Sequence, residues 1–324
     1  VWRFIATKYG REKIGEIFQS MKRYGNAQKG FEDAIGMDFE ELTEQWHKYI
    51  KKEYYPDVEG RDEVKDIAKR LTDHKKSGNF YNVSPTISPD GSHIAVLSDR
   101  SGYMDIYLLD AVSGRKVKRL IKGNRSIDFE ELKFLQPGIS WSPDSEKIVI
   151  AAKAGSSDAL YLINIKTGKQ EKIPFQLDGV FTATWSPNGD KLAFVGNEGG
   201  ASDIYLYDLV SKKLVNLTDD VFSDSEPSWN SDGTQIVFVS DRDKIIDKNK
   251  ISSKGMFYHN YKQKNIYTLN LETKKINQIT DTQYNENYPI FANTKDVIFY
   301  TADYQGTWNL FRHDLLTGES VVIT

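Results

Sequence analysis

The chain repeats one short phrase four times, as Ser88-Pro89-Asp90-Gly91, Trp141-Ser142-Pro143-Asp144, Trp185-Ser186-Pro187-Asn188-Gly189 and Trp229-Asn230-Ser231-Asp232-Gly233. Each copy precedes an apolar alternating run and then a tyrosine-bearing strand such as Asp105-Ile106-Tyr107-Leu108. A repeated strand-rich phrase is typical of stacked units, and four-stranded units stack into a propeller. The sequence therefore predicts a mainly β fold built as a β-propeller of four-stranded blades.

The spacing of the phrase gives the size of the unit. Its serine, or the asparagine that replaces it, stands at 88, 142, 186 and 230, in steps of 54, 44 and 44. A unit of about forty residues has the length of a propeller blade. A fifth unit lacks the phrase but keeps Val297-Ile298-Phe299-Tyr300. We expect at least five blades in this chain and six or more in the parent protein, because an open ring leaves strand edges exposed.

The phrase itself reads as turn chemistry. Pro89 presets φ, Asp90 can bond its own backbone and Gly91 accepts a positive φ. The preceding tryptophans (Trp141, Trp185 and Trp229) are expected to pack between neighbouring blades. The repeated pairs Asp99-Arg100 and Asp241-Arg242 are expected to bond to each other or to backbone in the next turn.

A small α-helical segment precedes the repeats. Apolar residues at three- and four-residue steps predict two short helices separated by Gly10. A third begins after Asp38, with Glu41 three residues later as a capping-box variant, and ends at Pro56. We expect three regions: the helical segment 1–56, a charged linker 57–79 with a short helix, and the propeller 80–324.

Composition excludes several functions. The 324 residues carry 43 Lys+Arg against 46 Asp+Glu, so no global field recruits nucleic acid. Cysteine is absent, which excludes disulfides and a cysteine nucleophile. The five histidines lack metal spacing, and no Gly-x-Ser-x-Gly motif occurs. The sequence predicts no catalytic residue, no metal, no cofactor and no membrane-inserting segment, and the start at Val1 indicates a processed or excised piece.

Two insertions lengthen the repeat, at Gly123–Gly138 and at Asp243–Lys264. Repeat proteins usually place contacts in such insertions. The second mixes charge with aromatic rings, a composition that suits a contact with a protein or a polyanion. Its alternatives are a solvated loop and, on the weak spacing of Asp241, Asp243, Asp247 and Asn249, a calcium loop without the required glycine. The predicted partner-binding residues are Lys244, Lys248, Lys250, Lys254, Phe257, Tyr258, His259 and Tyr261.

Over residues 80–324 the sequence resembles the TolB-like (WD40-like) propeller repeat, through Trp-Ser-Pro-Asp-Gly, Ser-Asp-Arg and Asp-Ile-Tyr. The resemblance implies protein partners, among them envelope or outer-membrane proteins, and a periplasmic or envelope location in a bacterium. The same repeat occurs in periplasmic TolB and in regulatory propellers of prolyl-oligopeptidase-type enzymes, so it does not name the ligand.

Residues 1–55 resemble the closing helices of a peptidase MA-like (gluzincin) domain, through Phe31-Glu32-Asp33-Ala34-Ile35-Gly36 and Phe39-Glu40-Glu41-Leu42 with Trp46. Gluzincin catalysis uses a His-Glu-x-x-His zinc helix, which this sequence lacks. The favoured interpretation is a non-catalytic interaction propeller. The alternatives are the substrate-filtering propeller of a zinc metallopeptidase with its active site upstream, and a sugar-processing propeller with paired carboxylates in the channel.

Overall fold

The computed structural model describes residues 1–58, 68–124, 129–133, 138–242, 258–294 and 296–324. The chain divides into two compact units, Val1–Arg70 and Leu71–Thr324. The first contains only helices among its described residues, and the second contains every described strand. None of the described helices has the length and apolar character needed to cross a membrane.

The described residues of the helical unit form four helices. They are α1 (Trp2–Tyr9), α2 (Glu12–Tyr24), α3 (Ala27–Ile35) and α4 (Phe39–Val58). Asp38 caps α4 as expected, because its carboxylate accepts a hydrogen bond from the Glu41 backbone N–H at 2.7 Å. The prediction of three helices was wrong: α3 was missed, and α4 runs past Pro56 to Val58.

Helix α3, which was not predicted from the sequence, packs closely against α2. Gly30 lies inside α3, where glycine is unfavourable. A Cβ on Gly30 would lie 2.4 Å from the Cγ of Met21 on α2, so the missing side chain lets the two helices approach. The unit's core is Phe4, Ile5, Ile17, Phe31, Ala34 and Leu42.

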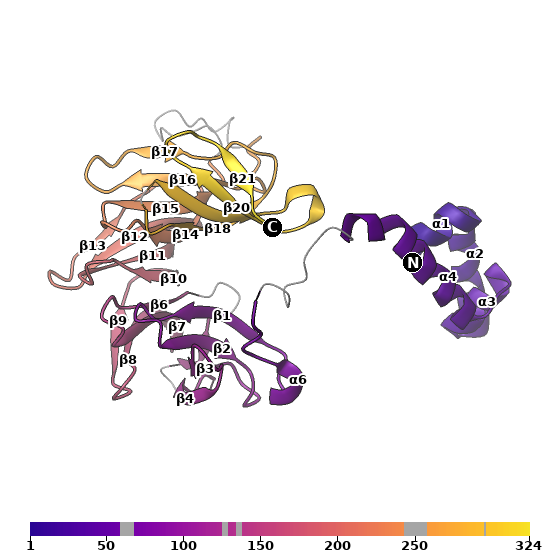
Figure 1. Ribbon diagram of the computed structural model, residues 1–324, viewed down its shortest axis with the longest axis horizontal. Helices are drawn as coiled ribbons and strands as arrows, with labels where there is room; N and C mark the ends of the chain where they lie inside the picture. The colour runs from indigo at the N-terminus through magenta and orange to yellow at the C-terminus, as the bar shows by residue number, and fades with distance from the viewer. Residues whose placement is uncertain (59–67, 125–128, 134–137, 243–257, 295) are drawn as a thin grey trace. The chain divides into compact units, whose positions relative to one another are not determined.

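The second unit is a five-bladed propeller of antiparallel sheets (Figure 1). A short helix, α6 (His74–Ser77), precedes the blades. The first three blades are β1 (Asn82–Ile87), β2 (His93–Ser98), β3 (Asp105–Asp110) and β4 (Lys116–Ile121); β6 (Ile139–Trp141), β7 (Lys147–Ala154), β8 (Ser157–Asn164) and β9 (Gln170–Pro174); and β10 (Gly179–Trp185), β11 (Lys191–Glu198), β12 (Ala201–Asp208) and β13 (Leu214–Asn216).

The last two blades repeat the order. They are β14 (Asp224–Trp229), β15 (Gln235–Ser240), β16 (Asn265–Asn270) and β17 (Ile276–Gln278); and β18 (Glu286–Phe291), β19 (Val297–Ala302), β20 (Asn309–Asp314) and β21 (Ser320–Val322). The first insertion adds a short strand, β5 (Glu131–Leu132), which pairs with β7. The predicted four-stranded blades are confirmed.

In the first four blades the repeated phrase forms the predicted turn at the end of the innermost strand. Gly91 has φ +72° and its N–H donates to the Ser88 carbonyl at 2.8 Å. The Ser88 hydroxyl donates to the Asp90 carboxylate at 2.5 Å, as the Ser142 hydroxyl does to Asp144. Turn geometry therefore explains why the phrase recurs.

The phrase tryptophans pack between blades, as expected. Trp141 lies in a core cluster with residues of the first and second blades, and its indole N–H donates to the Thr86 carbonyl of the first blade at 3.0 Å. Trp229 donates to the Thr184 carbonyl of the third blade at 3.3 Å. Trp185 instead donates to the Gly189 carbonyl of its own turn. Each ring buries apolar area while its N–H stays bonded, which ties consecutive blades together.

Candidate functional site

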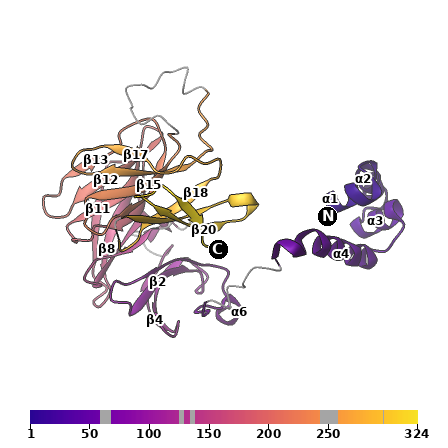
Figure 2. The same cartoon turned by 45° about the horizontal axis from the view of Figure 1, so that its top comes forward.

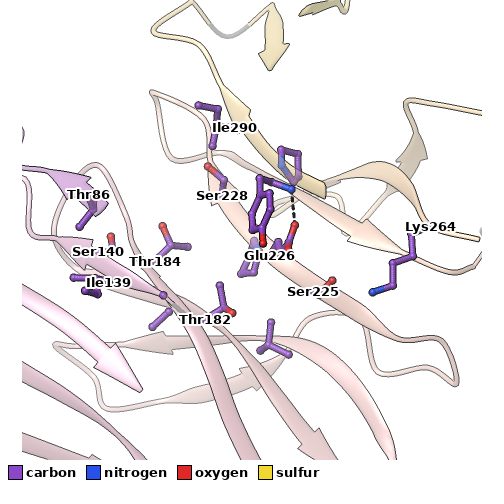
Figure 3. A pocket seen from close by; sticks show the side chains of 16 residues that line it. Thr86, Ile139, Ser140, Thr182, Thr184, Ser225, Glu226, Ser228, Lys264 and Ile290 are labelled. Carbon is purple, nitrogen blue, oxygen red and sulfur yellow. Dashed lines mark hydrogen bonds between the residues drawn. The ribbon is translucent and has the colours of Figure 1, made fainter. Parts of the chain in front are cut away.

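The innermost strands of the five blades line a cavity of about 350 Å³ at the propeller's centre. Figure 3 shows side chains from all five blades around it, from Thr86 on β1 to Ile290 on β18. This volume is at the lower end of the range for small-ligand sites. The cavity is the central channel in which propellers commonly bind ligands.

One ring of lining residues stands just before the phrase aromatic, or its counterpart, in each blade. Its members are Thr86, Ser140, Thr184, Ser228 and Ile290. Four of the five carry a hydroxyl, which can both donate and accept a hydrogen bond. The ring therefore offers polar, uncharged contacts on four sides and an aliphatic contact from the fifth blade.

A second ring stands two residues earlier on the same strands and is conformationally strained. In four blades the residue at this position has a left-handed backbone, with φ 51° at Ser84, 30° at Thr182, 56° at Glu226 and 55° at Tyr288. Each lies at a break in strand register, which marks a β-bulge. Bulges leave a residue outside the ladder and redirect side chains, and such strain concentrates at functional sites.

The strain at Thr182 can be measured. Thr182→Gly is expected to raise the free energy of unfolding by about 1 kcal/mol, since a β-branched residue is costly at positive φ and glycine is not. The control Thr184→Gly, two residues along β10, should lower it by a similar amount. Urea unfolding of both variants measures the two changes in unfolding free energy. An equal decrease in both variants would show that Thr182 is unstrained.

Charge in the channel is concentrated at Glu226. Its carboxylate accepts a hydrogen bond from the Tyr288 backbone N–H, which joins the fourth and fifth blades (Figure 3). Burial raises the pKa of Glu226, while the Tyr288 N–H and the positive charge of Lys264 oppose that rise. Burial, together with the Glu226 charge, also raises the pKa of Tyr288. Among the residues that the structure describes, the channel thus presents one carboxylate and one ammonium group alongside hydroxyls.

The sugar-processing alternative needs two carboxylates flanking a glycosidic bond. Among the described residues that line the cavity, Glu226 is the one carboxylate. The described lining therefore does not show the pair of carboxylates that this alternative expects.

The predicted partner-binding residues fall into two groups. Lys244, Lys248, Lys250, Lys254 and Phe257 lie outside the described residues. Tyr258 and Tyr261 are exposed, with the Lys262 ammonium 5.9 Å from the centre of the Tyr261 ring. His259 is partly buried, with its ring 5.3 Å from that of Phe222 and its Nε2 3.8 Å from an Asp241 oxygen.

A second polar cluster lies between the third and fourth blades. The carboxylates of Asp203, Asp220 and Asp224 lie within 4.8 Å of one another. Arg242, 1% exposed, donates to Asp220 at 2.8 Å and to Asp224 at 2.6 Å. The guanidinium therefore supplies positive charge to this cluster. Burial raises the pKa of Asp224 to about 6, although the Arg242 charge opposes that rise.

This cluster corrects the expected pairing of the repeated Asp-Arg pairs. The two residues do not bond to each other. Asp99 accepts hydrogen bonds from the Phe80 and Tyr81 N–H groups, and Asp241 accepts one from Ser223. These donors lie in the segment that enters the same blade, not in the next turn. The aspartate fastens that segment, while the arginine reaches the blade's innermost strand.

Sequence comparison agrees with the fold. Residues 133–246, which span the second and third blades and part of the fourth, match the family described as the TolB beta propeller domain, PD40. No curated protein sequence matches the chain. The site thus lies in a β-propeller, and the matched blades are TolB-like.

Solved structures give the same architecture. TolB from Acinetobacter baumannii superposes with a TM-score of 0.57 at 20% identity, covering 74% of this chain and 53% of that one. A putative TolB from Agrobacterium tumefaciens gives 0.59 at 19% identity, with 75% and 80% covered. An oligogalacturonate lyase in complex with manganese gives 0.55 at 12% identity, with 79% and 68% covered. This chain spans about half of the Acinetobacter TolB, and identities this low establish the fold alone.

Proposed function

We propose that the propeller is a non-catalytic protein-interaction module of a bacterial cell-envelope protein. The observation that carries the proposal is the channel: a ring with four hydroxyls, and strained bulges on the same innermost strands, at a cavity whose described lining holds one carboxylate. Hydroxyls and bulged backbone suit hydrogen bonding to an extended polypeptide, whose own backbone needs donors and acceptors. The likeness to TolB propellers supports protein partners and an envelope location.

The second contact of this proposal is the insertion between β15 and β16. Tyr258 and Tyr261 are 75% and 67% exposed, and large exposed aromatics are typical of contact surfaces. Lysines in the same insertion add positive charge. His259, whose side chain is 9% exposed, would anchor the end of this loop next to Asp241 and leave the tyrosines for contact.

Site-specific photocrosslinking tests both contacts. A benzophenone amino acid at Thr184, in the channel, and at Tyr261, in the insertion, should each capture a protein in bacterial cells. Deletion of 244–263, which removes Tyr261, should weaken capture by the crosslinker at Thr184, with the circular dichroism spectrum unchanged. Ser228→Trp, which fills the channel ring, should abolish capture at Thr184. Lys169, on the exposed β8–β9 turn, is the matched surface control. Adducts no stronger than at Lys169 would refute the proposal.

The filtering alternative places catalysis outside this chain. It predicts that a larger protein carrying a zinc motif cleaves peptides and that Ser228→Trp changes which peptides are cleaved. Peptidase or glycosidase activity of residues 1–324 alone would contradict the non-catalytic proposal.

A further inference from the structure

Among its described lining residues, the channel holds one acid and one base, and both come from the fourth blade. Glu226 lies on β14, the innermost strand, and Lys264 directly precedes β16. Tyr288 on β18 bonds to Glu226 from the fifth blade, which Figures 1 and 2 show beside the fourth. In Figure 3 Glu226 and Lys264 lie on the side of the cavity away from Thr86. A ligand bound on this side would meet both charges.

The blade architecture requires neither charge. Glu226 stands two residues before the first ring, and the other blades have uncharged residues at that position, namely Ser84, Gly138, Thr182 and Tyr288. Lys264 stands directly before the Asp-Ile-Tyr motif of the third strand or its counterpart. No other blade has a cation at that position, where the residues are Met104, Asp158, Ser202 and Trp308. The repeat therefore does not explain the pair.

The Glu226 carboxylate has room for a further hydrogen bond. The Tyr288 N–H donates to its Oε2, and no hydrogen bond from the described residues reaches Oε1. Burial raises the pKa of Glu226, and the Lys264 ammonium opposes that rise through its charge and not through a hydrogen bond. The acid and the base are thus near enough to interact but are not bonded to each other. A carboxylate accepts several hydrogen bonds, so Oε1 can accept one from a ligand.

The two charges together select the class of ligand. A metal cation would be attracted by Glu226 but repelled by Lys264, and an anion such as phosphate would meet the reverse. The uncharged backbone of a polypeptide can bond to the hydroxyls of the first ring but leaves both charges without a partner, which is costly where they are buried. A molecule that carries both an ammonium and a carboxylate meets two attractions and forms charge-assisted hydrogen bonds with both groups.

We propose that this side of the channel binds a small zwitterion of the α-amino acid or dipeptide class, with its ammonium on Glu226 and its carboxylate on Lys264. Ser228, two residues after Glu226 on β14, offers a hydroxyl to the amide of a dipeptide. The cavity of about 350 Å³ holds a molecule of this size. This small-ligand site goes beyond the protein-interaction role proposed above, and neither depends on the other.

Isothermal titration calorimetry on the purified chain tests the proposal. The probes are glycine, glycylglycine, N-acetylglycylglycine and glycylglycine amide. Glycine or glycylglycine should bind at millimolar concentration or below. Blocking either terminus of glycylglycine should weaken its binding by about tenfold, because one charge-assisted hydrogen bond is lost. Whether glycine or glycylglycine binds more tightly distinguishes a free amino acid from a dipeptide as the ligand.

Two substitutions assign each charge to one terminus of the ligand. Glu226→Gln keeps an oxygen for the Tyr288 N–H and should weaken glycylglycine about tenfold, with no further loss for N-acetylglycylglycine. Lys264→Met should weaken glycylglycine equally, with no further loss for glycylglycine amide. Glu272→Gln and Lys274→Met, both exposed in the β16–β17 hairpin of the same blade, are the matched charge controls and should leave every affinity unchanged.

Three results would overturn the proposal. Equal binding of glycylglycine and its amide would assign the site to an amino terminus alone. Unchanged affinity for glycylglycine in a folded Glu226→Gln protein would show that the carboxylate does not hold the ammonium. No binding of any probe, by calorimetry and by ligand-observed NMR, would show that the cavity takes no such molecule. Crosslinking from Thr184 in cells reports the protein partner separately, so the two proposals can fail independently.

Discussion

Arg242→Met is expected to lower the free energy of unfolding at pH 7 by about 3–5 kcal/mol, the cost of leaving buried carboxylates without their cation. Asp224 is 0% exposed and Asp220 lies beside it, both bonded to the guanidinium. Methionine keeps an apolar stem against Phe222, Phe238 and Tyr267, whose ring centres lie 5.3–5.6 Å from the guanidinium carbon. The loss therefore reports charge more than packing. Urea unfolding at pH 7 measures it.

Arg100→Met is the matched control, because Arg100 occupies the same position in the first blade. It donates to the Ser98 hydroxyl and lies 5.1 Å from the Tyr107 ring, as Arg242 does with Ser240 and Tyr267. On the innermost strand Arg100 bonds to the neutral Asn82. The Arg100→Met change therefore leaves no carboxylate without its cation and should lower the free energy of unfolding by only about 1 kcal/mol. Equal losses in the two variants would show that the Arg242 cluster is not held by charge.

The pH dependence adds a second readout for Arg242→Met. Without the guanidinium, the pKa of Asp224 should rise above its present value of about 6, since the cation lowers it now. A carboxyl group whose folded pKa lies above its ordinary value of 3.8 adds to the stability of the protein as the pH falls through the folded pKa. The loss in unfolding free energy caused by Arg242→Met should therefore become smaller as the pH falls from 7 to 5. The double variant Arg242→Met, Asp224→Asn should recover part of it at pH 7.

Local chemistry made the blades predictable from the sequence. The phrase needs Pro, Asp and Gly for its turn, and the tryptophan needs a large apolar gap between sheets, so these residues reveal the repeat. The hairpins follow from period-two runs between turns. These features depend on residues close in sequence, which is why the strand pattern and the turns were predicted correctly.

Features that depend on distant residues were missed. Helix α3 contains Gly30, which is unfavourable in a helix by itself and is explained by the close approach of Met21 from α2. The strained ring was hidden because Ser84, Glu226 and Tyr288 each precede a proline, and a residue before proline is expected to be extended. The repeat still aligns Ser84, Thr182, Glu226 and Tyr288 at one position in their blades, two residues before the first ring. That alignment could have indicated residues near the channel.

The repeat also explains why Glu286 differs from Asp224. Both residues begin the innermost strand of their blade, and both are 0% exposed. In the fourth blade Arg242 follows Ser240-Asp241, but in the fifth Tyr304 follows Ala302-Asp303, so Glu286 has no arginine at that position. The hydroxyls of Thr280 and Thr282 bond to it instead. Burial then raises the pKa of Glu286 to about 7, although these hydrogen bonds oppose the rise.

Glu286→Gln is therefore expected to stabilise the protein above neutral pH. The folded pKa of about 7 exceeds the ordinary 4.5, so the natural glutamic acid contributes stability below pH 4.5 and loses it as pH rises through 7. The shift corresponds to about 3 kcal/mol at pH 8, and glutamine, which stays neutral, avoids that loss. Unfolding free energies of the two proteins should be similar at pH 4.5 and diverge by pH 8.

The exposed Glu319→Gln, in the β20–β21 hairpin, is the control for a changed net charge and should show no such divergence. A Glu286→Gln protein that is less stable at every pH would contradict the prediction. It would mean that Glu286 is ionised in the folded protein and accepts the hydrogen bonds from Thr280 and Thr282 as a carboxylate. A gain that grows with pH would show that the fifth blade holds a neutral acid where the fourth holds an ion pair. The two blades would then fill one position in the repeat by different chemistry, set by whether arginine or tyrosine stands two residues after the second strand.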